Sequence, residues 1–86
     1  MNLDRRIQRL IAVGASVSAN CQPCLQINAG KAREDGAEEA EIAEAIEVGR
    51  LVREGAASKL DKFAAGLSQA VPIGAAASAD GCSCGE

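Results

Sequence analysis

The chain has 86 residues and a formal net charge of −3, with no histidine, tryptophan or tyrosine and a single phenylalanine. Without histidine it cannot build a Ser-His-Asp triad, a Cys-His nucleophile pair or a histidine-ligated zinc site. The scarcity of aromatic rings argues against base stacking, and a pI near 4.9 disfavours a nucleic acid or an anionic membrane as partner. A chain this short forms one small domain whose isolated monomer is marginally stable.

Apolar residues recur with a helical period at the start of the chain, and nothing in the composition favours a sheet. The spacing predicts a first helix over about residues 3–19, capped by Asn2 or Asp4. A second helix is expected over about residues 21–35. Asn20 suits its N-terminus, Pro23 is tolerated in a first helical turn, and Gly36 suits a left-handed C-terminal cap.

A third and longer helix is predicted from about residue 38 to residue 67. It carries two apolar rows, and a helix with two such rows usually contacts two partners. We therefore expect an all-α fold, in which a short N-terminal helix precedes a helical hairpin with a long third helix, and the chain assembles into an oligomer. Phe63 is expected in the core, with Gly49 and Gly55 at close helix contacts. The longer row holds Ile42, Ala45, Ile46, Gly49, Val52, Ala56, Leu60, Phe63 and Leu67, and the thinner row holds Val48, Leu51 and Gly55.

The helical pattern stops near residue 68, so we expect a helical domain over residues 1–68 and a flexible C-terminal tail over residues 69–86. The tail carries Cys82-Ser83-Cys84. No run reaches the ~18 apolar residues of a membrane span. The predicted compartment is the cytoplasm, where four cysteines are more often redox-active or metal-binding than structural staples.

Cys21-Gln22-Pro23-Cys24 carries most of the functional signal. Two thiols on one helical turn can close a disulfide, and the dipole and free N–H groups of a helix N-terminus stabilise a thiolate, which is the nucleophile. Arginines 5, 6 and 9 add positive charge if the first helix folds back over the site. The same spacing also serves metal binding or simple packing, and those alternatives stay open.

Cys82 and Cys84 form a second close pair of thiols. A linker of roughly ten flexible residues spans about 17–19 Å, so the tail can reach the first pair and exchange electrons with it. A hook for a soft metal or metalloid ion, built from Cys21, Cys24, Cys82 and Cys84, is the alternative. A tail without chemistry is the third interpretation.

The order of these features resembles the alkylhydroperoxidase D-like, or carboxymuconolactone decarboxylase-like, family over about residues 8–66. The resemblance rests on the CxxC motif, Asn28 one turn after it, Gly36, and the acidic helix start from Glu38 to Ala45. It implies an all-α fold, homo-oligomers that are commonly trimers or hexamers, and two cysteines that cycle between dithiol and disulfide. It also implies that Cys21 is the resolving thiol and Cys24 the peroxide-reactive thiol.

Two positions depart from the peroxidase branch of that family. Asn28 stands where the branch has a histidine, and Arg9 stands where it has a glutamate. Asn28 shares a helix face with the two cysteines and can hydrogen-bond a sulfur or water, but it cannot accept a proton near neutral pH. Glu44 or Glu47 is a candidate substitute for the missing glutamate.

The sequence therefore predicts a thiol–disulfide redox protein with weak peroxidase activity. Cys21, Cys24 and Asn28 are the candidate catalytic residues, and Cys82 and Cys84 a secondary redox or metal pair. No cofactor is expected, unless the cysteines hold a soft metal ion. The expected partners are other copies of the chain and a thiol or disulfide reactant. The alternative functions are a metal- or metalloid-binding module and a non-catalytic oligomeric scaffold.

Overall fold

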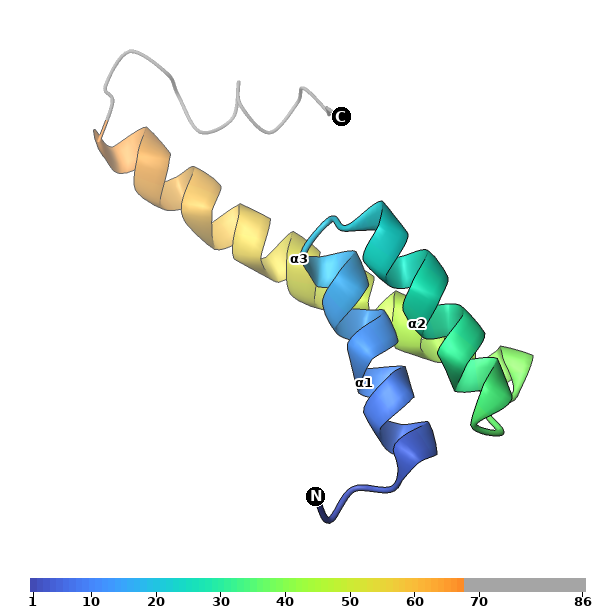
Figure 1. The fold of residues 1–86 in the computed structure, drawn as a ribbon. Coiled ribbons are helices and arrows are strands. Elements are labelled where there is room, and N and C mark those ends of the chain that lie inside the picture. The colour runs from blue at the N-terminus through green and yellow to red at the C-terminus, as the bar shows by residue number, and fades with distance from the viewer. Residues whose placement is uncertain (68–86) are drawn as a thin grey trace. The chain divides into compact units, whose positions relative to one another are not determined.

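The computed structural model describes residues 1–67 and contains three helices in that range, with no strand. They are α1 (Arg5–Ser18), α2 (Gln22–Glu34) and α3 (Glu39–Leu67) (Figure 1). The predicted all-α class is confirmed, and each helix begins and ends within about two residues of the predicted bounds. The chain divides into two compact units, Met1–Glu54 and a second that begins at Gly55, so that α3 belongs to both.

Each end of α1 is stabilised by a local cap. Asp4 accepts a hydrogen bond from the backbone N–H of Ile7 at 2.9 Å, which confirms the second of the two predicted caps. At the other end Asn20 adopts a left-handed conformation with φ 57°, and its N–H donates to the Val17 carbonyl. The N–H of Cys21 then reaches back to the carbonyl of Ser16, which completes a Schellman motif.

The connection from α2 to α3 repeats this arrangement with a glycine. Gly36 has φ 95°, a conformation that favours a residue without a Cβ. Its N–H donates to the Arg33 carbonyl, and the N–H of Ala37 donates to the Ala32 carbonyl. Ala37 is buried against the core, so this cap also anchors the start of α3.

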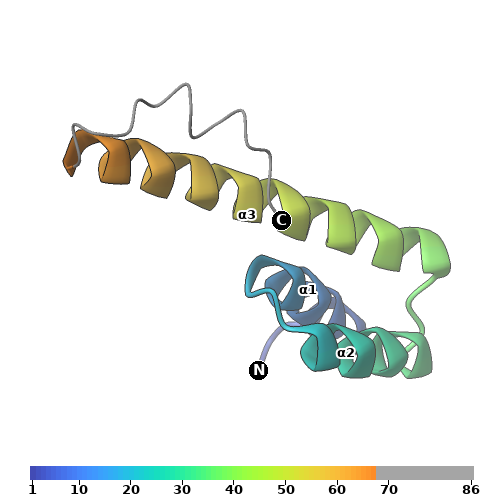
Figure 2. The same cartoon turned by 90° about the horizontal axis from the view of Figure 1, so that it is seen from above.

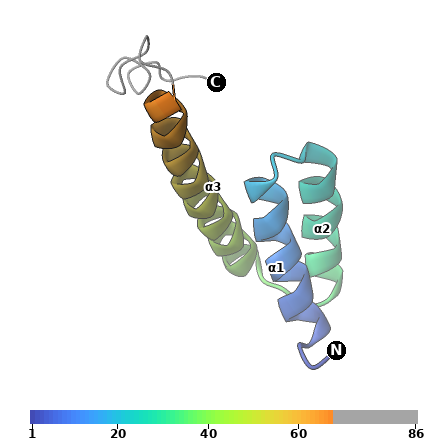
Figure 3. The same cartoon turned by 90° about the vertical axis from the view of Figure 1, so that its left-hand side faces the viewer.

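Within the Met1–Glu54 unit, α2 runs antiparallel to α1, and the first part of α3 runs parallel to α1 (Figures 2 and 3). Ion pairs from α1 to the end of α2 and the start of α3 lie at one end of the unit. The core between the helices is small because its members are short. It consists of buried Val13, Ala32, Ala37 and Ile42, with the partly buried Leu10, Leu25, Ala29, Ala45 and Ile46 packed against them.

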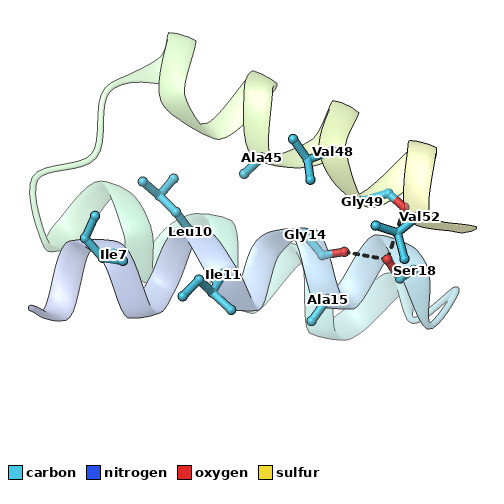
Figure 4. A pocket seen from close by; sticks show the side chains of 10 residues that line it. All are labelled: Ile7, Leu10, Ile11, Gly14, Ala15, Ser18, Ala45, Val48, Gly49 and Val52. Carbon is cyan, nitrogen blue, oxygen red and sulfur yellow. Dashed lines mark hydrogen bonds between the residues drawn. The ribbon is translucent and has the colours of Figure 1, made fainter. Parts of the chain in front are cut away.

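Gly14 of α1 and Gly49 of α3 lie in close backbone contact. A Cβ on Gly49 would meet the Gly14 carbonyl oxygen, the Gly14 Cα at 3.0 Å and the Val17 Cβ at 2.9 Å. Ser18 Oγ lies 3.2 Å from the Gly14 carbonyl oxygen and 3.0 Å from the Gly49 carbonyl oxygen, so its single O–H can donate to either (Figure 4). The expected close packing at Gly49 is therefore confirmed, whereas nothing lies within 4 Å of a Cβ at Gly55.

The prediction that Phe63 lies in the core is wrong for the single chain, because its side chain is 65% exposed. The long apolar row of α3 is buried or half-buried only through Gly49, and Val52, Leu60 and Leu67 are exposed as well. The physical reason is the length of the partners. Helices α1 and α2 have 14 and 13 residues, and α3 has 29. At a rise of about 1.5 Å per residue, neither short helix can cover the whole of α3.

We expect Gly49→Ala to lower the free energy of unfolding by about 1–3 kcal/mol, because the added methyl group forces the two backbones apart. Gly30→Ala is the matched control. Nothing lies within 4 Å of a Cβ there, so losing a glycine inside α2 should raise stability by about 0.5–1 kcal/mol. Chemical denaturation followed by circular dichroism measures both values. Equal effects of the two substitutions would contradict the role assigned to the Gly14–Gly49 contact.

Candidate functional site

Cys21 and Cys24 are joined by a disulfide at the N-terminus of α2, with their Cα atoms 5.3 Å apart. That separation lies within the ordinary range for a disulfide. Cys21 is the N-cap residue of α2, and its Sγ accepts a hydrogen bond from the backbone N–H of Cys24 at 3.3 Å. Cys21 is half-buried and Cys24 is exposed. The pair can therefore be reached from solvent, and in the bridged state Cys21 Sγ faces a backbone N–H of the helix N-terminus.

The local sequence accounts for the position of Cys21. The left-handed Asn20 reverses the chain directly after α1, so that Cys21 both closes the cap of α1 and opens α2. Asparagine tolerates this conformation better than most residues. Pro23 occupies the first turn of α2, where its missing N–H leaves no partner unsatisfied. The predicted N-cap was Asn20, and the observed cap lies one residue later.

The structure brings Asn28 onto the same turn face as the cysteines but directs its amide at the backbone and at α1. Its Nδ2 donates to the Cys24 carbonyl at 2.9 Å and to Ser16 Oγ at 3.3 Å, and Ser16 Oγ itself donates to the Ala12 carbonyl at 2.7 Å. Because the Cys24 carbonyl only accepts, the amide nitrogen must face it. Asn28 therefore holds the first turn of α2 against α1, and its nitrogen is not available to a sulfur.

Arg6 and Arg9 of α1 do not lie beside the cysteines, contrary to the expectation. Arg6 pairs with Glu41, and Arg9 Nε pairs with Asp35 Oδ2 at 2.9 Å. Both pairs lie at the end of the unit opposite the turn that carries Cys21. The pKa of Glu41 is lowered, chiefly because its carboxylate accepts a hydrogen bond from the backbone N–H of Glu38, and further because it pairs with Arg6.

The two candidate substitutes for the missing glutamate do not join the site. Glu44 is exposed on α3, and Glu47 pairs with Arg50 at 3.2 Å. Neither residue lines the cavity beside the disulfide. The part of the chain that the structure describes therefore places no carboxylate where it could accept a proton from Cys21 in that cavity.

Arg53, which the sequence pattern does not single out, reaches the disulfide end of the unit from α3. Its Nη1 donates to Asn20 Oδ1 at 3.2 Å and to the Val17 carbonyl at 3.4 Å. A signal was present in the sequence, because Arg53 follows Gly49 by four residues and so stands on the packed face of α3. Arg53 and Cys21 line one cavity of about 240 Å³, together with Ser16, Val17, Asn20, Gln22 and Leu25.

Cys82 and Cys84 lie outside the described residues, and so does the tail over residues 69–86 in which they were predicted to act. Among residues 1–67, no group of three or more His, Cys, Asp or Glu side chains is arranged to hold a metal ion. In the same part of the chain, no helix is long and apolar enough to cross a membrane.

The fold and this site define a class of small, all-α proteins with a CxxC disulfide at the start of the second helix. The sequence profile of the carboxymuconolactone decarboxylase family matches residues 1–66. The chain therefore belongs to that family, as the resemblance predicted. No curated protein and no solved structure matches the chain significantly.

Proposed function

We propose that this protein is a thiol–disulfide oxidoreductase that cycles Cys21 and Cys24 between dithiol and disulfide. The observation that carries the proposal is the bridged pair at the N-terminus of α2, with one sulfur held by a backbone N–H and the other cysteine exposed. In a reducing compartment such as the cytoplasm, a pair of this kind is more often redox-active than structural.

The proposed cycle begins with a thiolate on Cys21, which is favoured by the Cys24 N–H. The thiolate attacks a partner disulfide, and one half of the partner leaves as a thiol after taking up a proton. The thiolate of Cys24 then attacks Cys21 Sγ, which closes the protein disulfide and releases the second half. Two electrons pass from the protein to the partner, and the two protons lost by the cysteines are recovered by the two product thiols.

The order in this cycle differs from the roles that the resemblance implies. The resemblance makes Cys24 the reactive thiol and Cys21 the resolving thiol, whereas the hydrogen bond to Cys21 Sγ supports Cys21 as the nucleophile toward disulfides. Cys24 is the more exposed of the two, which suits a thiol that meets an external oxidant. We therefore propose Cys21 for disulfide exchange and leave peroxide reduction as a weak activity.

The test uses the full chain with Cys82→Ser and Cys84→Ser, so that only the thiols of Cys21 and Cys24 can react with the reagent. One equivalent of 4,4′-dithiodipyridine should release two equivalents of thiopyridone, and the protein should lose two hydrogens by mass. Cys24→Ser should release one equivalent and keep a mixed disulfide on Cys21, because no second thiol is present to resolve it. Accumulation of mixed disulfides on both Cys21 and Cys24, in the protein that keeps both, would overturn the proposal.

We expect weak peroxidase activity, because the chain has no histidine and no carboxylate of residues 1–67 lines the cavity beside the disulfide. Asn28→His should raise the rate of cumene hydroperoxide reduction by about tenfold to a hundredfold, since general base catalysis is typically worth about 10²–10⁴ and only one member of a relay is restored. Asn28→Ala is the control and should give no increase. Stopped-flow measurement of the reduced proteins gives the rate of peroxide reduction for each variant. Rapid peroxide reduction by the wild type would refute the expectation of weak activity.

We further propose that the chain assembles with copies of itself. The Met1–Glu54 unit has an apolar groove of about 430 Å³ between α1 and α3, whose lining includes Ile11, Val48 and Val52 (Figure 4). Those three side chains and that of Leu51 are each more than half exposed. An exposed apolar surface of this kind is typical of protein–protein contacts. A second copy of the chain is the occupant we expect, because the family resemblance implies homo-oligomers, with a trimer or hexamer favoured.

Leu51→Glu should therefore reduce assembly and stability together, because it places a charge in the thinner apolar row of α3. Ala43→Glu adds the same charge to an exposed position of the same helix outside both rows. Analytical ultracentrifugation at micromolar concentration should show a multiple of 8.7 kDa for the wild type and for Ala43→Glu, and a shift toward 8.7 kDa for Leu51→Glu. A wild type that sediments as a stable 8.7 kDa species would refute the proposed assembly.

A further inference from the structure

The cavity beside the disulfide is lined both by a cationic side chain and by one cysteine of the pair. Arg53 and Cys21 both line it, and Val17 and Leu25 contribute apolar surface. At about 240 Å³ it is smaller than the roughly 300–1,000 Å³ pockets that hold drug-sized ligands. A cavity of this size suits one half of a small molecule, with the other half left in solvent.

The charge of Arg53 is not neutralised by the described part of the chain. Four other arginines each form an ion pair with a carboxylate, whereas no carboxylate within residues 1–67 lies in ion-pair distance of Arg53. Its two hydrogen bonds both use Nη1 and both go to neutral oxygens, those of Asn20 and Val17. A guanidinium has five N–H donors in a planar fork that matches a carboxylate. Half-buried on the wall of the cavity, Arg53 therefore retains donors and charge for an anion.

We propose that this cavity binds a small disulfide or thiol that carries a carboxylate, with Arg53 holding the carboxylate and Cys21 Sγ meeting the substrate sulfur. The inference rests on the proposed function and adds the substrate class. The apolar side chains of Val17 and Leu25 suit the short carbon chain between the two groups.

The exchange step keeps atoms and electrons in balance. The Cys21 thiolate attacks the nearer sulfur of the bound disulfide, the substrate S–S bond breaks, and the half in solvent leaves as a thiolate that takes a proton from water. Cys24 then attacks Cys21 Sγ, closes the protein disulfide and releases the half held at Arg53. The dithiol is oxidised and the substrate is reduced to two thiols. In the reverse direction two carboxylate-bearing thiols reduce the protein.

The test compares two disulfides of the same shape, 3,3′-dithiodipropionate and its uncharged diamide. The reduced full chain with Cys82→Ser and Cys84→Ser is mixed with each, quenched with acid and analysed by mass for the Cys21–Cys24 disulfide. With Arg53 unchanged, this protein should react about tenfold faster with the dicarboxylate, because Arg53 can form charge-assisted hydrogen bonds with a carboxylate but not with an amide of the same shape. The net charge of −3 by itself favours the diamide, so global charge cannot produce this preference.

Arg53→Gln should bring the ratio of the two rates to about one or below, and Arg53→Lys should keep part of the preference because it keeps the charge. Arg50→Gln is the matched control, since Arg50 lies one turn earlier on α3, is exposed and pairs with Glu47. It should leave the ratio unchanged. A merely structural role of Arg53 would slow both reactions and leave their ratio intact.

Two results would overturn the inference alone, with the redox cycle intact. One is a wild-type ratio of one or below, and the other is a ratio that survives Arg53→Gln. If neither disulfide nor 4,4′-dithiodipyridine oxidises Cys21 and Cys24, the proposed function itself fails. Oxidation of the protein by the diamide and by 4,4′-dithiodipyridine therefore separates a failure of the proposed substrate class from a failure of the redox cycle.

Discussion

The arrangement of the site depends on the close contact between Gly14 of α1 and Gly49 of α3. Only residues without side chains allow the two backbones to approach this closely, and Ser18 Oγ lies within hydrogen-bond distance of the carbonyls of both glycines. One turn after Gly49, α3 presents Arg53 to the turn that carries the cysteines. A wider separation of the helices would withdraw the guanidinium from the cavity, so a packing contact sets the electrostatics of the site.

A second constraint is the short turn between α1 and α2, in which one residue serves both helix ends. Asn20 takes the left-handed conformation, and Cys21 both completes the cap of α1 and serves as the N-cap of α2. Cys21 Sγ therefore faces a backbone N–H because of the helix start itself. Asn28 and Ser16 then fix the first turn of α2 against α1. Under the proposed function, this backbone N–H is the group that would stabilise a Cys21 thiolate in a chain without histidine.

The fold was largely predictable because each helix has apolar residues at helical spacing and recognisable residues at its ends. The Asp4 cap and the Gly36 turn were visible in the sequence and are observed. The partners of the charged side chains were not predictable, since periodicity places a residue on a face without saying what lies opposite. Arg9 was expected near the cysteines and instead pairs with Asp35, and Arg53 was overlooked although it follows Gly49 on the packed face. Phe63 was misplaced because an apolar row shows that a face is suited to burial without showing that this chain itself covers it, and the side chain is 65% exposed.

The most direct test of the redox claim is an equilibrium titration of the full chain with Cys82→Ser and Cys84→Ser. The protein is equilibrated in dithiothreitol buffers of graded redox ratio, and its free thiols are alkylated and counted by mass. We expect the free thiols of Cys21 and Cys24 to be lost together in a single two-electron transition, without accumulation of a singly alkylated species. Thiols that stay reduced across the whole range, or that disappear independently of one another, would contradict it.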